Sequence, residues 1–140
     1  MLKKMLISAI VSLSVASCVN AGELKTDMDM LSGSVSAIQQ GFFTNNKAFT
    51  LDSLAKFRKD VKAVLGDKET ITKLLPEDLK YKASIAINSA EMIDKYIAEI
   101  EDTLTDKNIR MIKRQMASQK AFLNIQAQCF RCHNLVRDWE

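Results

Sequence analysis

Two cysteines and a histidine near the C-terminus are the residues of this chain that could do chemistry together, in the sequence Cys129-Phe130-Arg131-Cys132-His133. Thiols three residues apart near a helix end can each add to one of the two vinyl groups of a haem, and the adjacent imidazole can then ligate the iron. The pattern therefore predicts one covalent haem c, attached through Cys129 and Cys132, with His133 as an axial iron ligand.

Three other uses of a Cys-x-x-Cys pair compete with haem attachment. A structural zinc site takes four ligands, but His133 is the only histidine and the third cysteine, Cys18, lies near the N-terminus. A thioredoxin-like dithiol belongs to a βαβ setting, for which the sequence gives no strand pattern. A disulfide between Cys129 and Cys132 remains an alternative in an oxidising compartment, although it would leave His133 without a role.

The N-terminal segment has the layout of a secretory signal. Lys3 and Lys4 give it a positive start, a short apolar stretch follows, and residues 19–21 resemble a small-residue cleavage site. The apolar stretch is shorter than the roughly 20 residues that span a bilayer. We therefore expect a signal peptide at residues 1–21 and a mature periplasmic protein at residues 22–140.

Cys18 leaves a second route open. The sequence Val15-Ala16-Ser17-Cys18 resembles the lipobox of bacterial lipoproteins, in which the cysteine is acylated and becomes the first residue. Acylation would anchor the protein to a membrane surface. Cleavage after Ala21 is the preferred interpretation, because little linker would separate Cys18 from the first helix.

Composition restricts the fold and the function. The chain has 140 residues with 4 glycines and 1 proline, which favours one domain built of long uninterrupted helices. Its formal charge of +3 falls further once Lys3 and Lys4 are removed, so it has no basic footprint for nucleic acid. The sequence shows no Ser-His-Asp set, paired-carboxylate cleft or phosphate-binding loop, and we expect no enzymatic turnover.

Hydrophobic periodicity predicts four helices. The first spans Glu23 to about Asn45, the second has Thr50 as its N-cap and ends at Gly66, and the third begins at Pro76 after a short helical turn at residues 71–74. The fourth begins at Thr105 or Asp106 and runs to about Arg137.

In the first three of these helices, apolar residues recur in alternating steps of four and three, which places them on one face, and apolar residues also mark the inner side of the fourth. The residues expected to face the core are Leu24, Met28, Leu31, Val35, Ile38, Phe42; Leu54, Phe57, Val61, Val64; Leu79, Ala83, Ala86, Ala90, Ile93, Ile97, Ile100, Leu104; and Ile109, Ile112, Met116, Leu123, Ile125, Cys129. The expected fold is all-α, an antiparallel up-down-up-down four-helix bundle with the haem motif at its C-terminal end. A coiled-coil dimer is the alternative for such heptads, and a homodimer stays open.

With its motif at the end of the last helix, the chain resembles the cytochrome c prime family of bacterial four-helix cytochromes, including its low-spin members with a Met ligand. The resemblance covers the architecture of essentially the whole mature chain and is most specific at the motif. It implies that Arg137, four residues after His133, shapes the proximal pocket; a solvent-exposed residue favoured by the helix dipole is the other interpretation. Val136 departs from the family, because many relatives have Tyr at this position.

Met28 is the expected sixth ligand of the iron. In an antiparallel bundle the end of the last helix lies beside the start of the first, and Met28 and His133 are each about 7.5 Å from those ends. Met30 lies near the same level but off the apolar stripe. Met92, Met111 and Met116 are roughly 20 Å or more away along their helices. Met-ligated relatives also carry their ligand early in the first helix.

A single haem in a small exported bundle most often shuttles electrons. We therefore expect an electron carrier that serves redox partner proteins of the respiratory chain. If Met28 does not reach the iron, the alternative is a five-coordinate haem protein that binds nitric oxide or another small gas. A structural subunit of a membrane complex is a third reading, which acylation of Cys18 would favour.

Overall fold

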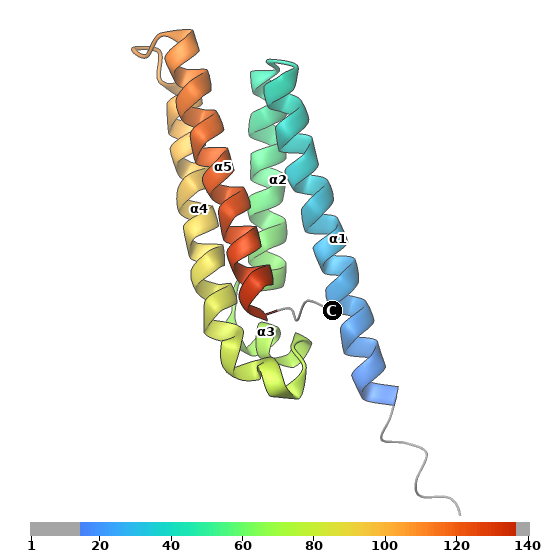
Figure 1. The fold of residues 1–140 in the computed structure, drawn as a ribbon. Coiled ribbons are helices and arrows are strands. Elements are labelled where there is room, and N and C mark those ends of the chain that lie inside the picture. The colour runs from blue at the N-terminus through green and yellow to red at the C-terminus, as the bar shows by residue number, and fades with distance from the viewer. Residues whose placement is uncertain (1–14, 137–140) are drawn as a thin grey trace, which may run out of the picture.

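The computed structural model describes the backbone of residues 15–136 and the side chains of residues 23–134. Every regular element in this part of the chain is a helix, as the sequence predicted. In chain order the elements are α1 (Val15–Phe43), α2 (Lys47–Leu65), α3 (Lys68–Leu74), the 3₁₀ helix η1 (Glu77–Lys82), α4 (Ala83–Thr105) and α5 (Met111–Val136) (Figure 1).

The first helix starts earlier than expected. It begins at Val15 rather than Glu23 and continues without a break through residues 19–21. The predicted cleavage after Ala21 stays a prediction, because this helix belongs to the uncleaved chain. The positively charged start of the signal and Arg137 lie outside the described residues.

The turn between α1 and α2 corrects the predicted N-cap. Asn46 caps α2, since its side-chain oxygen accepts a hydrogen bond of 3.0 Å from the backbone N–H of Phe49. Thr50 is buried inside the helix, where its hydroxyl donates to the carbonyl of Asn46 at 2.8 Å. The prediction of Thr50 as the cap was wrong by one turn, and the end of α2 at Gly66 is confirmed.

The third predicted helix proves to be two elements. Pro76 precedes the 3₁₀ helix η1, and the α-helix α4 begins only at Ala83. The helical turn expected at residues 71–74 is confirmed as part of α3, which Asp67 caps by accepting from the N–H of Thr70 at 2.8 Å. The core-facing stripe predicted for this region is buried from Ala83 to Leu104, and Leu79 is half-buried.

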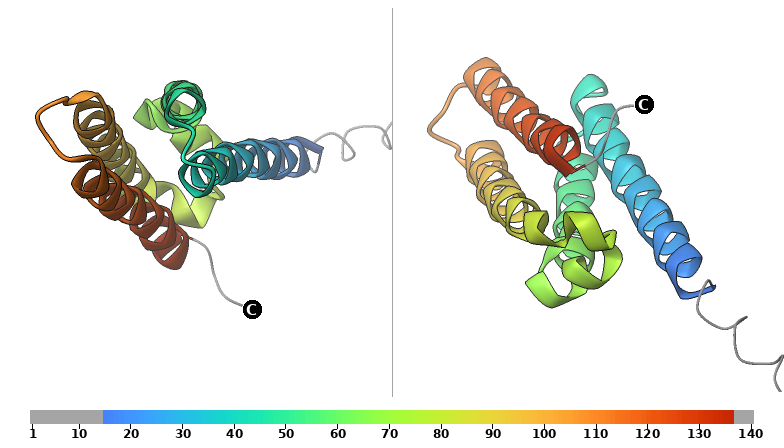
Figure 2. Two further views of the ribbon diagram at one scale, coloured as in Figure 1. Left: turned by 90° about the horizontal axis from the view of Figure 1, so that it is seen from above. Right: turned by 60° about the horizontal axis from the view of Figure 1, so that its bottom comes forward.

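Four long helices form the body of the molecule. The pairs that pack closely are α1 with α2, α2 with α4, and α4 with α5, whereas α3 and η1 lie across the lower end (Figure 1). Seen from above, α4 and α5 run side by side while α1 points away from them (Figure 2). The edge between α1 and α5 is therefore the one that is not closely packed. No helix among the described residues is both long enough and apolar enough to cross a membrane.

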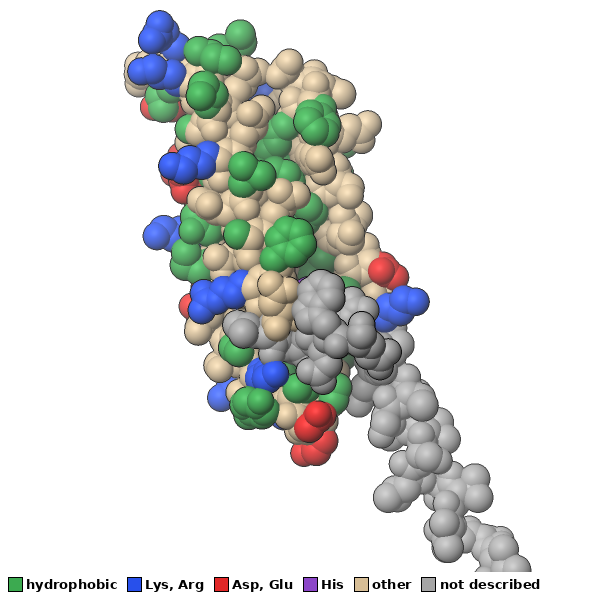
Figure 3. Space-filling view, in the orientation of Figure 1, with side chains coloured by type: hydrophobic (Ala, Val, Ile, Leu, Met, Phe, Trp, Pro, Cys, Tyr) green, Lys and Arg blue, Asp and Glu red, His purple; other side chains and the backbone are tan. Residues whose placement is uncertain are grey.

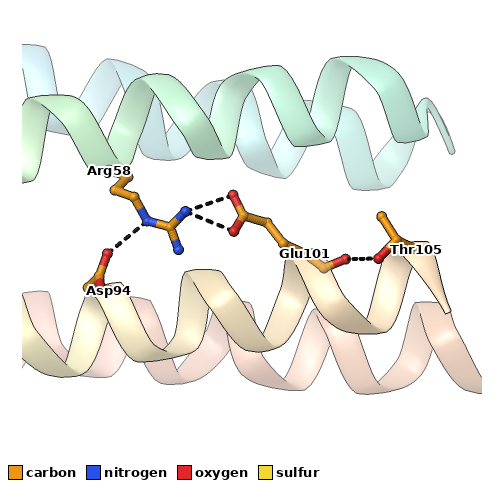
Figure 4. Close-up of polar contacts among 4 residues, drawn as sticks. All are labelled: Arg58, Asp94, Glu101 and Thr105. Carbon is orange, nitrogen blue, oxygen red and sulfur yellow. Dashed lines mark hydrogen bonds and ion pairs between the residues drawn. The ribbon is translucent and has the colours of Figure 1, made fainter.

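An ion-pair network fixes α2 against α4 (Figure 4). The Nε of Arg58 donates to Asp94 at 2.7 Å, and one terminal nitrogen donates to both carboxylate oxygens of Glu101 at 3.0 and 2.8 Å. Burial lowers the pKa of Arg58, but its hydrogen bonds and ion pairs with Glu101 and Asp94 outweigh this effect and raise it. The hydroxyl of Thr105 donates to the backbone carbonyl of Glu101 at 2.8 Å, one turn earlier in α4.

The inward face predicted for α5 was largely wrong. Ile112, Met116 and Leu123 are 58%, 64% and 62% exposed. The residues that α5 buries are instead Ser118, Ala121, Phe122 and Ile125. Of the predicted stripe, Ile125 is buried, and Cys129 is half-buried against the core.

Candidate cofactor-attachment site

The Cys-x-x-Cys-His motif occupies the last turns of α5. Cys129 and Cys132 are half-buried and pack against the hydrophobic core as free thiols. Burial raises the pKa of both thiols, and the charge of Cys132 raises that of Cys129 further. His133 and Phe130 are exposed. Both thiols therefore lie on the inner side of α5, and the imidazole lies at its margin.

Two contacts identify the side of α5 that faces α1. The rings of Phe42 in α1 and Phe122 in α5 lie 5.6 Å apart between centroids, at an angle of 49°. About two helical turns earlier in α5, the amide of Gln115 donates to the side-chain oxygen of Asn45, in the turn that follows α1, at 2.6 Å. His133 follows Gln115 by 18 residues, which is about five helical turns. His133 therefore lies on the side of α5 that faces α1.

The same contacts set the level of His133 along α1. Counted from the ring pair, equal steps along the two helices bring His133 level with Leu31. Counted from the pair of amide side chains, they bring it level with Asp27. Met28 lies between these two residues, within about one turn of the level of His133. This register agrees with the predicted level of Met28, although the argument from the helix ends does not hold, because α1 begins at Val15 rather than at Glu23.

The side chain of Met28 also lies on the side of α1 that faces the core and α5. Met28, Val35 and Phe42 are seven residues apart and so share one heptad position. All three are half-buried against the core, and Phe42 contacts α5 directly. Met30 is 39% exposed and is absent from this cluster. Met111 and Met116 are exposed at the opposite end of α5 from the motif.

The candidate site residues lie at a similar height along α1 and α5, at an edge of the bundle where these two helices do not pack closely. Met28, Cys129 and Cys132 border the same hydrophobic core, while α1 and α5 do not pack closely along the edge where they lie (Figure 2). Leu31 and Ile125, both buried, add apolar walls on the two helices.

The donor set fits a haem better than a metal ion alone. Two thiols point inward from one helix, and one imidazole lies on the side toward α1. Among the residues whose side chains are described, no group of three or more His, Cys, Asp or Glu could hold a metal ion. A covalent porphyrin needs no such group, since it brings four nitrogen ligands of its own.

Gln128 is a neighbour of the motif that the sequence did not single out. Its side-chain oxygen is buried and has no hydrogen-bond partner among the described residues. Burying such an oxygen without a partner costs free energy. Gln128 lies seven residues after the buried Ala121, on the inner flank of α5, and no feature of the sequence singled it out.

A separate cavity of about 260 Å³ lies between α2 and α4, on the opposite edge of the bundle from the motif. Apolar side chains and the Arg58 network line it, and it contains none of the predicted site residues.

Comparison of the chain with known protein families, with curated proteins and with solved structures finds no match.

Proposed function

We propose that the protein is a periplasmic monohaem c-type cytochrome that carries electrons between redox partner proteins of the respiratory chain. The proposal includes an up-down-up-down bundle of the cytochrome c prime kind, cleavage after Ala21 and no enzymatic turnover. One observation carries it. The only histidine, the two motif cysteines and a core-facing methionine occupy one level of the edge between α1 and α5.

Each residue has a defined part in this proposal. Cys129 and Cys132 form thioethers to the porphyrin, His133 ligates the iron from the side of α5, and Met28 supplies its thioether from α1. When bound, the haem would provide a one-electron couple. Arg137, beyond the described residues, is proposed to adjust the proximal pocket.

A five-coordinate haem protein that binds nitric oxide or another small gas is the second candidate. The observation that favours it is the loose packing of α1 against α5. Because Met28 is on α1 and the haem motif is on α5, this packing does not force Met28 to ligate the iron. The open iron position would then face the apolar side chains of Met28 and Val35 on α1.

Covalent attachment is the first test. We expect the exported protein to keep its haem through acid–acetone extraction, which removes haem that is not covalently bound. The double variant Cys129→Ala/Cys132→Ala should release it. Extraction of all the haem from the unchanged protein, or export of a stable colourless protein by a host that matures c-type cytochromes, would show that the motif does not attach haem.

Iron ligation is the second test, and it separates the two candidates. We expect a low-spin ferric spectrum with the near-infrared sulfur-to-iron band. Met28→Ala should lose this band, and the control Met30→Ala should keep it, because Met30 is exposed beside the same level of α1. A high-spin spectrum of the unchanged protein at neutral pH would reject Met28 as a ligand and support the gas-binding candidate.

A further inference from the structure

The outer face of α5 carries a second apolar row that the bundle does not use. Ile112, Met116, Leu123 and Phe130 are all exposed, the last at 65%. Figure 3 shows hydrophobic side chains in a row along the face of α5. From Ile112 to Phe130 the row is about 27 Å long. We call these four residues the outer seam.

The spacing of the outer seam is that of a helix-packing surface. Its residues follow steps of four and seven, and Gln119 and Gln126 occupy the positions that complete a four–three alternation. Such an alternation keeps one stripe facing a second helix over several turns. Two of the six positions in this stripe are glutamines, whose amides can hydrogen-bond to a partner helix but would lack partners in a lipid core.

The charge of α5 specifies the partner further. From Met111 to Val136 the helix has no acidic residue. Lys113, Lys120 and Arg131 are exposed beside the outer seam and form no ion pair with any described residue. Figure 3 shows Lys and Arg side chains along the left edge of the hydrophobic row.

This charge disfavours a second copy of α5 as the occupant. Two such helices packed along the seam would bring cations near cations with no carboxylate on either helix to compensate. A helix with acidic flanks would instead find three free cations along one border.

We infer that the outer seam docks an amphipathic helix of a partner protein, with apolar residues at its own seam and Asp or Glu on its flank. This inference depends on the outer face of α5 and not on the cofactor. Phe130 lies between the two motif cysteines, so a helix seated on the seam ends beside them. If the proposed function is also correct, the partner is therefore brought next to the haem.

The test uses the exported full-length protein and two synthetic helical peptides of about three heptads. Both peptides have Leu at their seam positions; one has Glu on its flanks and the other has Lys. Fluorescence anisotropy should show binding of the Glu peptide only, with an affinity that falls as salt screens the charges. Equal binding of both peptides, or of neither, would overturn the inference.

Matched variants locate the binding surface. Met116→Gln/Leu123→Gln and Lys120→Glu should each weaken the Glu peptide about tenfold or more, as expected for central contacts of an interface. The controls are Tyr81→Gln, another exposed apolar residue, and Lys95→Glu, another exposed cation. Both controls should leave the affinity unchanged. If Lys120→Glu weakens binding of the Glu peptide but the seam variant does not, the interaction is charge attraction alone, and the inference that the outer seam docks a helix is wrong.

Two further measurements distinguish other occupants. In co-sedimentation with vesicles of equal parts phosphatidylcholine and phosphatidylglycerol, the unchanged protein and the seam variant should behave alike. In analytical ultracentrifugation, the two proteins should show the same oligomeric state. Vesicle binding that the seam variant loses would assign the outer seam to a membrane, and a dimer that the seam variant loses would assign it to a second copy. None of these readouts requires a bound haem, so their failure is distinct from failure of the proposed function.

Discussion

Gly41 of α1 lies directly against Thr50 of α2, and Gly41→Ala should weaken the fold. A Cβ at this position would overlap the hydroxyl oxygen of Thr50 and lie 3.0 Å from its Cα. Thr50 cannot move aside, because it is 2% exposed and its hydroxyl is bonded to Asn46. Overpacking of this kind costs about 3 kcal/mol. Alanine has a higher helix propensity than glycine, which offsets about 1 kcal/mol of this loss in the free energy of unfolding.

The net expectation is a loss of about 2 kcal/mol in the free energy of unfolding. For a chain of this size, that lowers the melting temperature by roughly 8 °C. Urea unfolding followed by circular dichroism measures the change. The second variant Gly41→Ala/Thr50→Ala should recover only part of the loss, since the contact with the backbone Cα of residue 50 remains.

Gly33 provides the matched control in the same helix. It is exposed, and a Cβ there would meet nothing within 4 Å. Gly33→Ala should therefore stabilise the protein by about 1 kcal/mol. If Gly41→Ala proves as stable as Gly33→Ala, the close approach of α1 to α2 is not as described, and the register of α1 against α5 must be reconsidered.

The remaining predictions concern charged groups that join helices. Burial raises the pKa of Asp60, but hydrogen bonds from Lys56 at 2.5 Å and Ser34 at 2.7 Å outweigh it and lower the pKa below the ordinary value. A carboxyl with a lowered pKa in the folded state adds stability above about pH 4 and loses it as the pH falls further. Asp60→Asn should therefore be less stable at pH 7 by about 1–2 kcal/mol and should show a flatter acid limb in unfolding curves; an unchanged acid limb would contradict this. A double-mutant cycle of Arg58→Met and Glu101→Gln should give a coupling of about 1 kcal/mol, a modest value because the guanidinium is one-third exposed. A coupling near zero at low salt would show that the bidentate contact adds nothing to stability.

Sequence periodicity located α4 and misassigned α5 for one physical reason. In α4 only one face carries a sustained apolar alternation, so the inward side follows directly. In α5 two alternations coexist, and the one with the larger side chains faces outward. Side-chain size on a single helix cannot show which face a neighbour will cover, because that depends on how the other helices pack against it.

The elements of the candidate site were predictable to different degrees. The level and the inward side of Met28 followed from helix geometry and from heptad spacing, and both agree with the contacts of Phe42 and Asn45. The N-cap was placed at Thr50 because its residue type suits a cap, as does that of Asn46, and only the chain path selects between them. The loose edge between α1 and α5 has no local signal, since it results from the packing of all four helices.

That loose edge implies an order of assembly. Helices α1 and α2 form one hairpin and α4 and α5 another, and each is stabilised by neighbours in sequence, which favours early formation. The α1–α2 pair packs against the α4–α5 pair later, because this step requires contacts between distant parts of the chain. Until then the thiols at the end of α5 stand on an already formed helix, where the proposed haem attachment would have access to them. The weakly packed edge between α1 and α5 is therefore expected to form last, and under the proposed function haem attachment would precede this final packing step.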